Sequence, residues 1–167
     1  MFLIINLISL KKIYISSDHA GFKLKEIIKK HLIKKKMNYF DLGPSSDNRV
    51  DYPDYAHKVA RKVKISKNNV GILVCGSGMG MNIAANKHKN IRAAQCFNLK
   101  STKLSRLHND ANIITLGSRL LTKKNALNCV SVFLNTKFES VRHANRIDCF
   151  REYCFSSCFG SSRFSAN

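Results

Sequence analysis

The residues best suited to chemistry in this chain surround one cysteine, Cys75. Residues 70–82 read VGILVCGSGMGMN, so an apolar run ends at Cys75, a turn with three glycines follows, and helix-compatible residues come next. A strand that leads through a glycine-rich turn into a helix leaves backbone N–H groups that can bind an anion. An isolated cysteine at a strand end is more often a core residue, but a thiol beside such a turn favours carbanion chemistry on an anionic substrate.

Short apolar runs alternate with longer amphipathic segments along the chain. This alternation predicts βαβ units and therefore an α/β fold, a three-layer, Rossmann-like arrangement with a five-stranded parallel sheet flanked by helices. Ligands of such sheets bind beyond the carboxyl ends of the strands, where Cys75 lies. The predicted strands are 12–16, 38–42, 70–75, 93–96 and 113–116, and the predicted helices are 22–35, 55–65, 79–87, 99–107, 123–134 and one that begins in 140–147.

The composition sets limits on partners and compartment. The net charge of +19 favours anionic partners, and nucleic acid is the first to consider. No aromatic or arginine-rich stripe accompanies the lysines, so we interpret them as solvated faces and expect no nucleic-acid partner. The six cysteines include no CxxC pair, and their pattern is typical of neither a disulfide framework nor a zinc site. We therefore expect a cytoplasmic protein without a bound metal.

Both ends of the chain differ from its middle. Residues 1–10 are apolar, but the run is too short to span a bilayer and lacks the basic start and cleavage site of a secretion signal. We therefore expect residues 1–11 to form an N-terminal extension without a membrane partner, and residues 12–147 to form one domain. Residues 148–167 hold three of the six cysteines and four of the ten phenylalanines, without a helical or strand period. We expect them to form an atypical C-terminal tail, with coil at residues 160–162.

Five motifs occur in an order that carries a resemblance. They are SSDHAG at 16–21, DYPDYA at 51–56, GILVCGSGMG at 71–80, LHNDANIITLGSR at 107–119 and RHANRI at 142–147. Together they closely resemble the type B ribose-5-phosphate isomerases, a family that includes galactose-6-phosphate isomerase subunits, over residues 12–147. The resemblance implies an enzyme without metal or cofactor that interconverts ribose 5-phosphate and ribulose 5-phosphate through an enediolate, in the non-oxidative pentose phosphate pathway.

Other functions stay open on the residues alone. One is isomerisation of a six-carbon sugar phosphate, galactose 6-phosphate or allose 6-phosphate, because pocket size depends on loop geometry. Another is a basic nucleic-acid-binding module, which the lysine excess favours but which leaves the CGSGMG turn without a role. A nucleotide-binding Rossmann protein fits less well, since the glycine turn follows the third predicted strand and not the first. The same fold without activity is a further alternative, if the tail disrupts the helix with Arg142 and Arg146.

The resemblance assigns the catalytic roles to four side chains. Cys75 is similar to the family's base, which moves a proton between C2 and C1 of the sugar. Ser77 stands where many relatives have threonine, and its hydroxyl could relay a proton between the two substrate oxygens. His108 is similar to the acid that opens the sugar ring, and Asp18 would bind a sugar hydroxyl on the other side. A histidine at a helix C-terminus that faces the dipole is the alternative for His108.

The same resemblance implies how the substrate is held. Phosphate would be bound by His19 and by three arginines, because guanidinium donors suit phosphate oxygens. Tyr52 would line the sugar pocket, Asn109 would bind a sugar or enediolate oxygen, and N–H groups of the glycine turn would neutralise the enediolate. The implied substrate-binding residues are His19, Tyr52, Gly76, Gly78, Gly80, Asn109, Arg119, Arg142 and Arg146.

The resemblance also implies an oligomer. In the family, the segment with His108, Asn109 and Arg119 reaches the partner subunit's site, so we expect a homodimer, or a tetramer, with a shared active site. For Arg142 and Arg146, four apart on one helical face, a solvated basic face is the alternative. We interpret the remaining histidines as surface or packing residues: His31, His57, His88 and His143.

Overall fold

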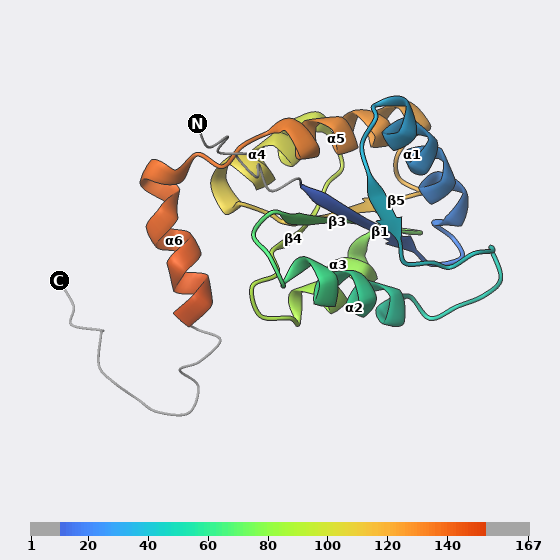
Figure 1. Ribbon diagram of the computed structural model, residues 1–167, viewed down its shortest axis with the longest axis horizontal. Coiled ribbons are helices and arrows are strands. Elements are labelled where there is room, and N and C mark those ends of the chain that lie inside the picture. The colour runs from blue at the N-terminus through green and yellow to red at the C-terminus, as the bar shows by residue number, and fades with distance from the viewer. Residues whose placement is uncertain (1–10, 153–167) are drawn as a thin grey trace, which may run out of the picture.

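Five short, mostly apolar segments pair into one parallel sheet in the order β2–β1–β3–β5–β4, in a computed structural model that describes residues 11–152 (Figure 1). The strands are β1 (Lys12–Ser17), β2 (Tyr39–Asp41), β3 (Asn69–Cys75), β4 (Ala93–Gln95) and β5 (Ile113–Gly117). Every residue of β3 is buried, because this central strand pairs with β1 on one side and β5 on the other. The predicted five-stranded parallel sheet is confirmed.

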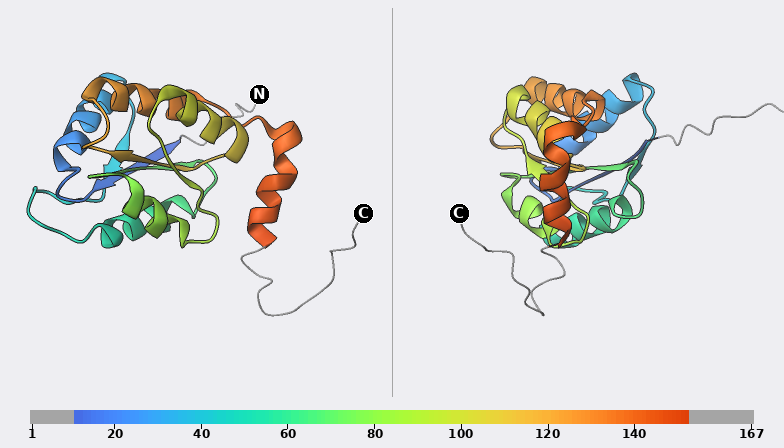
Figure 2. Two further views of the ribbon diagram at one scale, coloured as in Figure 1. Left: turned by 180° about the vertical axis from the view of Figure 1, so that it is seen from behind. Right: turned by 90° about the vertical axis from the view of Figure 1, so that its left-hand side faces the viewer.

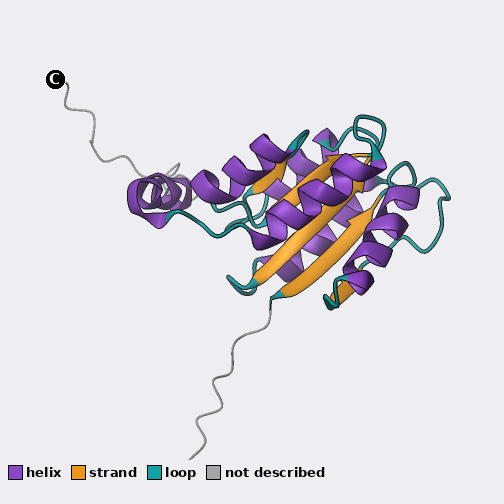
Figure 3. Cartoon of the chain, turned by 90° about the horizontal axis from the view of Figure 1, so that it is seen from above, coloured by secondary structure: helices purple, strands orange, loops and turns teal. Residues whose placement is uncertain are grey.

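Helices cover both faces of the sheet, which completes the three predicted layers (Figures 1 and 2). One layer holds α1, α4 and α5, the other holds α2 and α3, and Figure 3 looks down on the first layer with the strands beneath it. Each layer closes its own cluster of buried apolar residues against the sheet. The helices are α1 (Phe22–Lys34), α2 (Tyr52–Val63), α3 (Met79–Asn86), α4 (Leu99–Asn109), α5 (Lys123–Asn135) and α6 (Ser140–Glu152).

The last helix lies outside these layers. α6 stands apart from the sheet and packs beside α4 (Figures 1 and 2). It runs without interruption to Glu152, so the helix predicted to begin in 140–147 continues through residues 148–152, the first five residues of the expected tail. These residues contain no glycine or proline, and nothing in them breaks the helix. The alternative in which the tail disrupts the helix with Arg142 and Arg146 is therefore not supported.

Among the helix ends that differ from the prediction, two lie near predicted site residues. α2 begins at Tyr52, three residues early, because Pro53 fits the first turn, where its missing N–H would be unpaired in any case. α4 extends to Asn109, so His108 and Asn109 belong to its last turn. The expectations for residues 1–10 and 153–167 lie outside the described residues. None of the helices within residues 11–152 is long and apolar enough to cross a membrane.

One lysine does not lie on a solvated face. The side chain of Lys25 in α1 is fully buried, and its Nζ lies 3.0 Å from Oδ1 of Asp41 and donates to the carbonyl oxygen of Pro44 at 2.6 Å. Burial acts to raise the pKa of Asp41, but hydrogen bonds from Lys29, Gly43 and Lys25 outweigh it and lower the pKa. The ion pair between the buried Lys25 and Asp41 therefore ties α1 to the loop that leads toward α2.

The turn after β1 is pressed against the end of β3. The amide of Asp18 donates to the carbonyl oxygen of Val74 at 3.1 Å, and Oδ1 of Asp18 accepts from the amide of Gly21 at 2.7 Å. A Cβ atom on Gly21 would overlap that same carbonyl oxygen of Val74. Glycine at this position therefore lets the Asp18 turn reach the carboxyl end of β3.

We expect Gly21→Ala to lower the free energy of unfolding by at least about 2 kcal/mol, because the clash is with backbone and no side chain can move aside. Urea unfolding of the purified variant measures the change. Lys23→Ala on the exposed side of α1 is the matched control, and it should stay within about 0.5 kcal/mol of the wild type. Equal stability of the two variants would contradict the close packing inferred for Gly21.

Candidate active site

Cys75 lies at the carboxyl end of β3 and contributes to a cavity of about 330 Å³. Although the residue is only 4% exposed, it is not sealed in the core, because it forms part of the cavity wall. The wall comes from the ends of β1, β3 and β5 and the starts of α2 and α3, as expected for a parallel sheet. The lining residues are Asp18, His19, Ala20, Tyr52, Cys75, Gly76, Ser77, Gly80, Arg119 and Leu120.

The glycine turn holds the sulfur of Cys75 in place. Gly78 is the N-cap of α3 with a left-handed φ of 83°, and its amide donates to Sγ of Cys75 at 3.0 Å. The amide of Met79 donates to Oγ of Ser77 at 3.3 Å. Two N–H groups of the turn are thus engaged within the turn itself. The expectation that the whole stretch from Gly76 to Gly80 holds an oxyanion is wrong for Gly78, whose amide serves the sulfur.

Tyr52 forms one wall of the cavity by lying against α3. A Cβ atom on Gly80 would lie 2.6 Å from Cε2 of the Tyr52 ring, so only glycine allows this contact. Tyr52 remains 42% exposed. Tyr52 therefore lies in the wall of the Cys75 cavity, at the first residue of α2 and against Gly80, and its place beside a sugar stays a prediction.

His19 and Arg119 supply the basic side of the same cavity. Nδ1 of His19 lies 3.3 Å from the carbonyl oxygen and 3.4 Å from the amide of Val50, so the ring is held by backbone through one nitrogen and Nε2 is left for another partner. The amide of Arg119 donates to the carbonyl oxygen of Gly76 at 3.0 Å, and its guanidinium lies beside Gly76. Arg119 therefore lies in the cavity of its own chain, which corrects its grouping with His108 and Asn109.

The other predicted residues form a second group, away from this cavity. His108 lies at the end of α4, and its ring stacks on that of His143 in α6 with centroids 4.2 Å apart and an angle of 22°. Arg142 and Arg146 belong to α6, and neither they nor His108 line the Cys75 cavity. Asn109 lines a separate cavity of about 480 Å³ beside α6. The structure thus brings the predicted residues together in two groups rather than one.

His143 is a residue of this second group that we interpreted from sequence as a surface or packing residue. It is buried, and its Nε2 accepts a hydrogen bond from Nε of Arg142 at 3.1 Å. Burial lowers the pKa of His143, and the neighbouring His108, Arg142 and Arg146 lower it further, while Glu139 acts in the opposite direction. Its position between Arg142 and Arg146 in the sequence was the one signal that could have marked it as a site residue. Its contact with His108 joins two different helices, and residue spacing within one helix cannot reveal such a contact.

The second group also contains side chains that could hold a metal ion. His108, Glu139 and His143 offer ligand atoms within 4.8 Å of one another. The two imidazole rings are nearly parallel, so their in-plane lone pairs do not converge on one point, and Arg142 already donates to Nε2 of His143. As these side chains lie, the group is better arranged to contact an anion through Arg142 than to chelate a cation.

Comparison with known proteins identifies a family and several relatives of this chain. The Ribose/Galactose Isomerase family matches residues 13–150. The chain is 42% identical over 139 residues to ribose-5-phosphate isomerase B of Escherichia coli. This match covers 83% of this chain and 93% of that protein.

Two solved structures extend the comparison. Ribose-5-phosphate isomerase B of Mycoplasma genitalium, with bound ribulose-5-phosphate, is 43% identical and superposes with a TM-score of 0.84 over 87% of this chain and 97% of that one. The isomerase of Clostridium thermocellum is 44% identical, with a TM-score of 0.83 over 85% and 96% of the two chains.

Thiol reactivity tests the placement of Cys75. Burial raises the pKa of Cys96 and of Cys129, whereas Cys75 borders a cavity and Cys149 is exposed. At pH 7.5 we expect iodoacetamide to modify Cys75 at least about tenfold faster than Cys96 or Cys129, because alkylation needs an accessible thiolate. Peptide mass mapping over time separates the sites, with Cys149 as the exposed reference. Alkylation of Cys75 as slow as that of Cys96 would contradict an accessible cavity.

The pKa of His143 predicts a pH effect on stability. Since this pKa is lowered from the ordinary 6.5, the unfolded chain binds more protons than the folded protein as the pH falls below that value. The folded state therefore loses stability on this side. The glutamine in His143→Gln does not titrate. From pH 7 to pH 5 the free energy of unfolding should therefore fall more in the wild type than in the variant. Urea unfolding at several pH values measures it, and parallel pH profiles would refute the assignment.

Proposed function

The chain belongs to the ribose/galactose isomerase family, and we propose that it is an aldose–ketose isomerase that interconverts ribose 5-phosphate and ribulose 5-phosphate. The observation that carries the proposal is the cavity that Cys75 lines together with the basic side chains of His19 and Arg119. A base and an anion-binding group in one cavity suit a phosphate ester that must lose a proton from carbon. Named relatives with a five-carbon substrate support the choice of sugar.

In the proposed mechanism Cys75 acts as the base. Its thiolate takes the proton from C2 of the open-chain aldose, the electron pair forms the C1–C2 double bond of the enediolate, and the same proton returns to C1 to give the ketose. The hydrogen bond from the amide of Gly78 keeps Sγ at the cavity wall for both transfers. The hydroxyl of Ser77 moves the second proton between the two substrate oxygens, and the amides of Gly76 and Ser77 face the negative charge.

Substrate binding follows from the same cavity. His19 and Arg119 bind the phosphate, Tyr52 lies along the carbon chain, and the carboxylate of Asp18 binds a sugar hydroxyl. Oδ1 of Asp18 is already engaged by Gly21, so Oδ2 is the oxygen for the sugar. We propose that the isomerase needs neither metal nor cofactor, since each proposed step uses a side chain or a backbone amide of the protein.

We propose that the second group of residues reaches the Cys75 cavity of another copy of the chain. His108, the acid that opens the ring, and the phosphate-binding Arg142 and Arg146 lie away from Cys75 in their own chain. A homodimer, alone or as half of a tetramer, would bring the two groups together across its interface. The separation of the two groups on one chain supports this arrangement.

The pathway and the compartment follow from the chemistry. We propose that the enzyme works in the non-oxidative pentose phosphate pathway, in the cytoplasm. The four cysteines within residues 11–152 are free, which is compatible with a reducing compartment. The six-carbon and nucleic-acid alternatives are not favoured, because the named relatives are ribose-5-phosphate isomerases and the family match spans the whole domain.

Turnover of ribose 5-phosphate to ribulose 5-phosphate tests the proposal. We expect Cys75→Ser to lower kcat by about 10²- to 10⁴-fold and to abolish exchange of the C2 proton, since a serine hydroxyl is a far weaker base. Cys149→Ser, on the exposed side of α6, is the matched control and should keep wild-type activity. His108→Ala should impair turnover of the cyclic sugar more than reactions of an open-chain one. Full activity of Cys75→Ser would show that another group is the base.

A further inference from the structure

Asp110 is the C-cap residue of α4, and both its backbone conformation and its charge are unfavourable at this position. Its backbone is left-handed, with φ 43° and ψ 42°, a conformation that favours glycine or asparagine. Its carboxylate also lies at a helix C-terminus, where the helix dipole disfavours a negative charge. A residue that persists against both preferences is held by other contacts, and such residues gather at functional sites.

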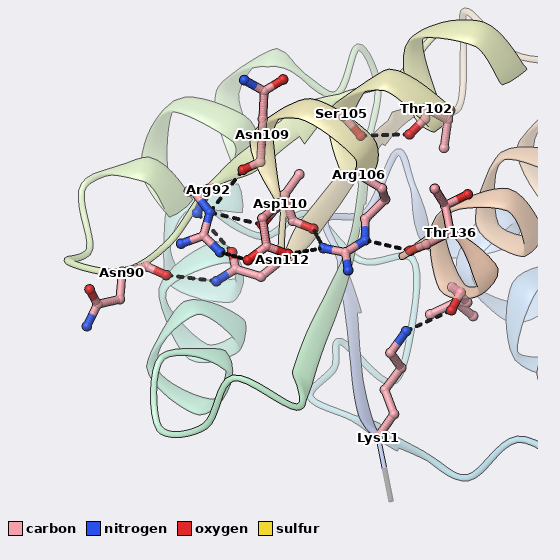
Figure 4. Close-up of polar contacts among 12 residues, drawn as sticks. Lys11, Asn90, Arg92, Thr102, Ser105, Arg106, Asn109, Asp110, Asn112 and Thr136 are labelled. Carbon is pink, nitrogen blue, oxygen red and sulfur yellow. Dashed lines mark hydrogen bonds and ion pairs between the residues drawn. The ribbon is translucent and has the colours of Figure 1, made fainter. Parts of the chain in front are cut away.

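Two arginines hold the carboxylate of Asp110 (Figure 4). Oδ2 accepts from Nη2 of Arg92 at 2.6 Å, and Oδ1 accepts from Nη1 of Arg106 at 3.0 Å. Both ion pairs are partly buried, so solvent screens them less than a surface pair. The two charges offset the unfavourable dipole and keep the side chain of Asp110 between them.

Arg92 and the amide of Glu139 hold the backbone on the two sides of His108. Nε of Arg92 donates to the carbonyl oxygens of Asn109 at 3.0 Å and Asp110 at 2.9 Å (Figure 4). On the other side of His108, the carbonyl oxygen of Leu107 accepts from the amide of Glu139 at 3.0 Å. Carbonyl groups at a helix end have no partners within the helix, and here they are held by residues from other elements.

The arginines are themselves fixed to the sheet side of the molecule. The amide of Arg92 donates to Oδ1 of Asn112 at 2.8 Å, and its carbonyl oxygen accepts from the amide of Asn112 at 3.0 Å. Arg106 is 9% exposed, and its Nε donates to the carbonyl oxygen of Thr136 at 3.3 Å (Figure 4). The last turn of α4 is therefore held from segments before β4, before β5 and after α5.

We infer that Asp110 is a positioning residue for the ring-opening step: together with Arg92 and Arg106 it fixes the last turn of α4, and through that turn the side chain of His108. The inference rests on the proposed function, in which His108 protonates the ring oxygen. A misplacement of about 1 Å of a group that acts on the substrate can lower a rate about 10²-fold. The mechanism above leaves Asp110, Arg92 and Arg106 without a role, and this inference gives them one.

Two substitutions at Asp110 test the inference. Asp110→Gly accepts the left-handed backbone and removes the clamp, and Asp110→Asn keeps the shape and removes the charge. We expect both variants to fold, and to turn over ribose 5-phosphate at least about tenfold more slowly than the wild type. Asp47→Asn, which removes an exposed carboxylate from the loop before α2, is the control and should keep wild-type activity. Activity of both Asp110 variants within twofold of the wild type would overturn the inference.

A second measurement separates positioning from a general structural effect. Ribulose 5-phosphate has no ring to open, so exchange of its C1 hydrogen with solvent should fall much less in Asp110→Gly than ribose 5-phosphate turnover does. In the His108→Ala background, Asp110→Gly should cause little further loss, because the two residues act in one step. Equal losses in both reactions, or additive losses in the double variant, would overturn the inference.

These experiments distinguish a failure of this inference from a failure of the proposed function. If the wild type does not isomerise ribose 5-phosphate, the proposed function fails and this inference fails with it. If the wild type is active and Cys75→Ser is not, while the Asp110 variants behave as the wild type, only the inference fails.

Discussion

The hydrogen bond from the amide of Gly78 to Sγ of Cys75 is the contact on which the cavity depends. It requires the left-handed backbone of Gly78, and it places the sulfur at the junction of a buried strand and a helix N-terminus. Because Gly78 begins α3, the same turn also sets the helix against which Tyr52 packs at Gly80. One backbone conformation therefore fixes both the reactive atom and a wall of the cavity.

The parallel sheet explains why the remaining residues meet there or do not. The ends of β1, β3 and β5 lie at one edge of the sheet, and hydrogen bonds between their following turns hold them in register. Ser118 illustrates this, since its amide donates to the carbonyl oxygen of Cys75 and its hydroxyl to that of Ala20. α4 and α6 are not part of this edge, and their groups pair with each other through His108 and His143. The connectivity of one chain thus leaves the two groups of residues apart.

Most of the sheet and the glycine turn could be predicted, because buried strands, amphipathic helices and glycine clusters leave signals within a few residues. Helix ends were less predictable: the last turn of α4 depends on how Asp110 is held, and its arginine partners include Arg92, which lies in another segment. Contacts between distant elements left no local signal at all. Burial of Lys25 and the stacking of His143 on His108 belong to this class. The buried Lys25 differs from the solvated faces expected for the lysines, whereas His143 is packed, which is one of the two interpretations given for it.

The excess of basic over acidic residues helps to explain these unpredicted contacts. The chain has 29 lysines and arginines but only ten acidic residues, so most cations have no carboxylate to pair with. Yet Asp41 and Asp110 each bind two cations: Asp41 holds Lys25 and Lys29 beside the turn at Gly43, and Asp110 holds Arg92 and Arg106 at the end of α4. Both carboxylates lie where the backbone leaves regular structure with a positive φ nearby. In this basic protein the scarce acidic groups therefore hold irregular backbone, and the excess positive charge leaves the basic side chains of the cavity available to an anion.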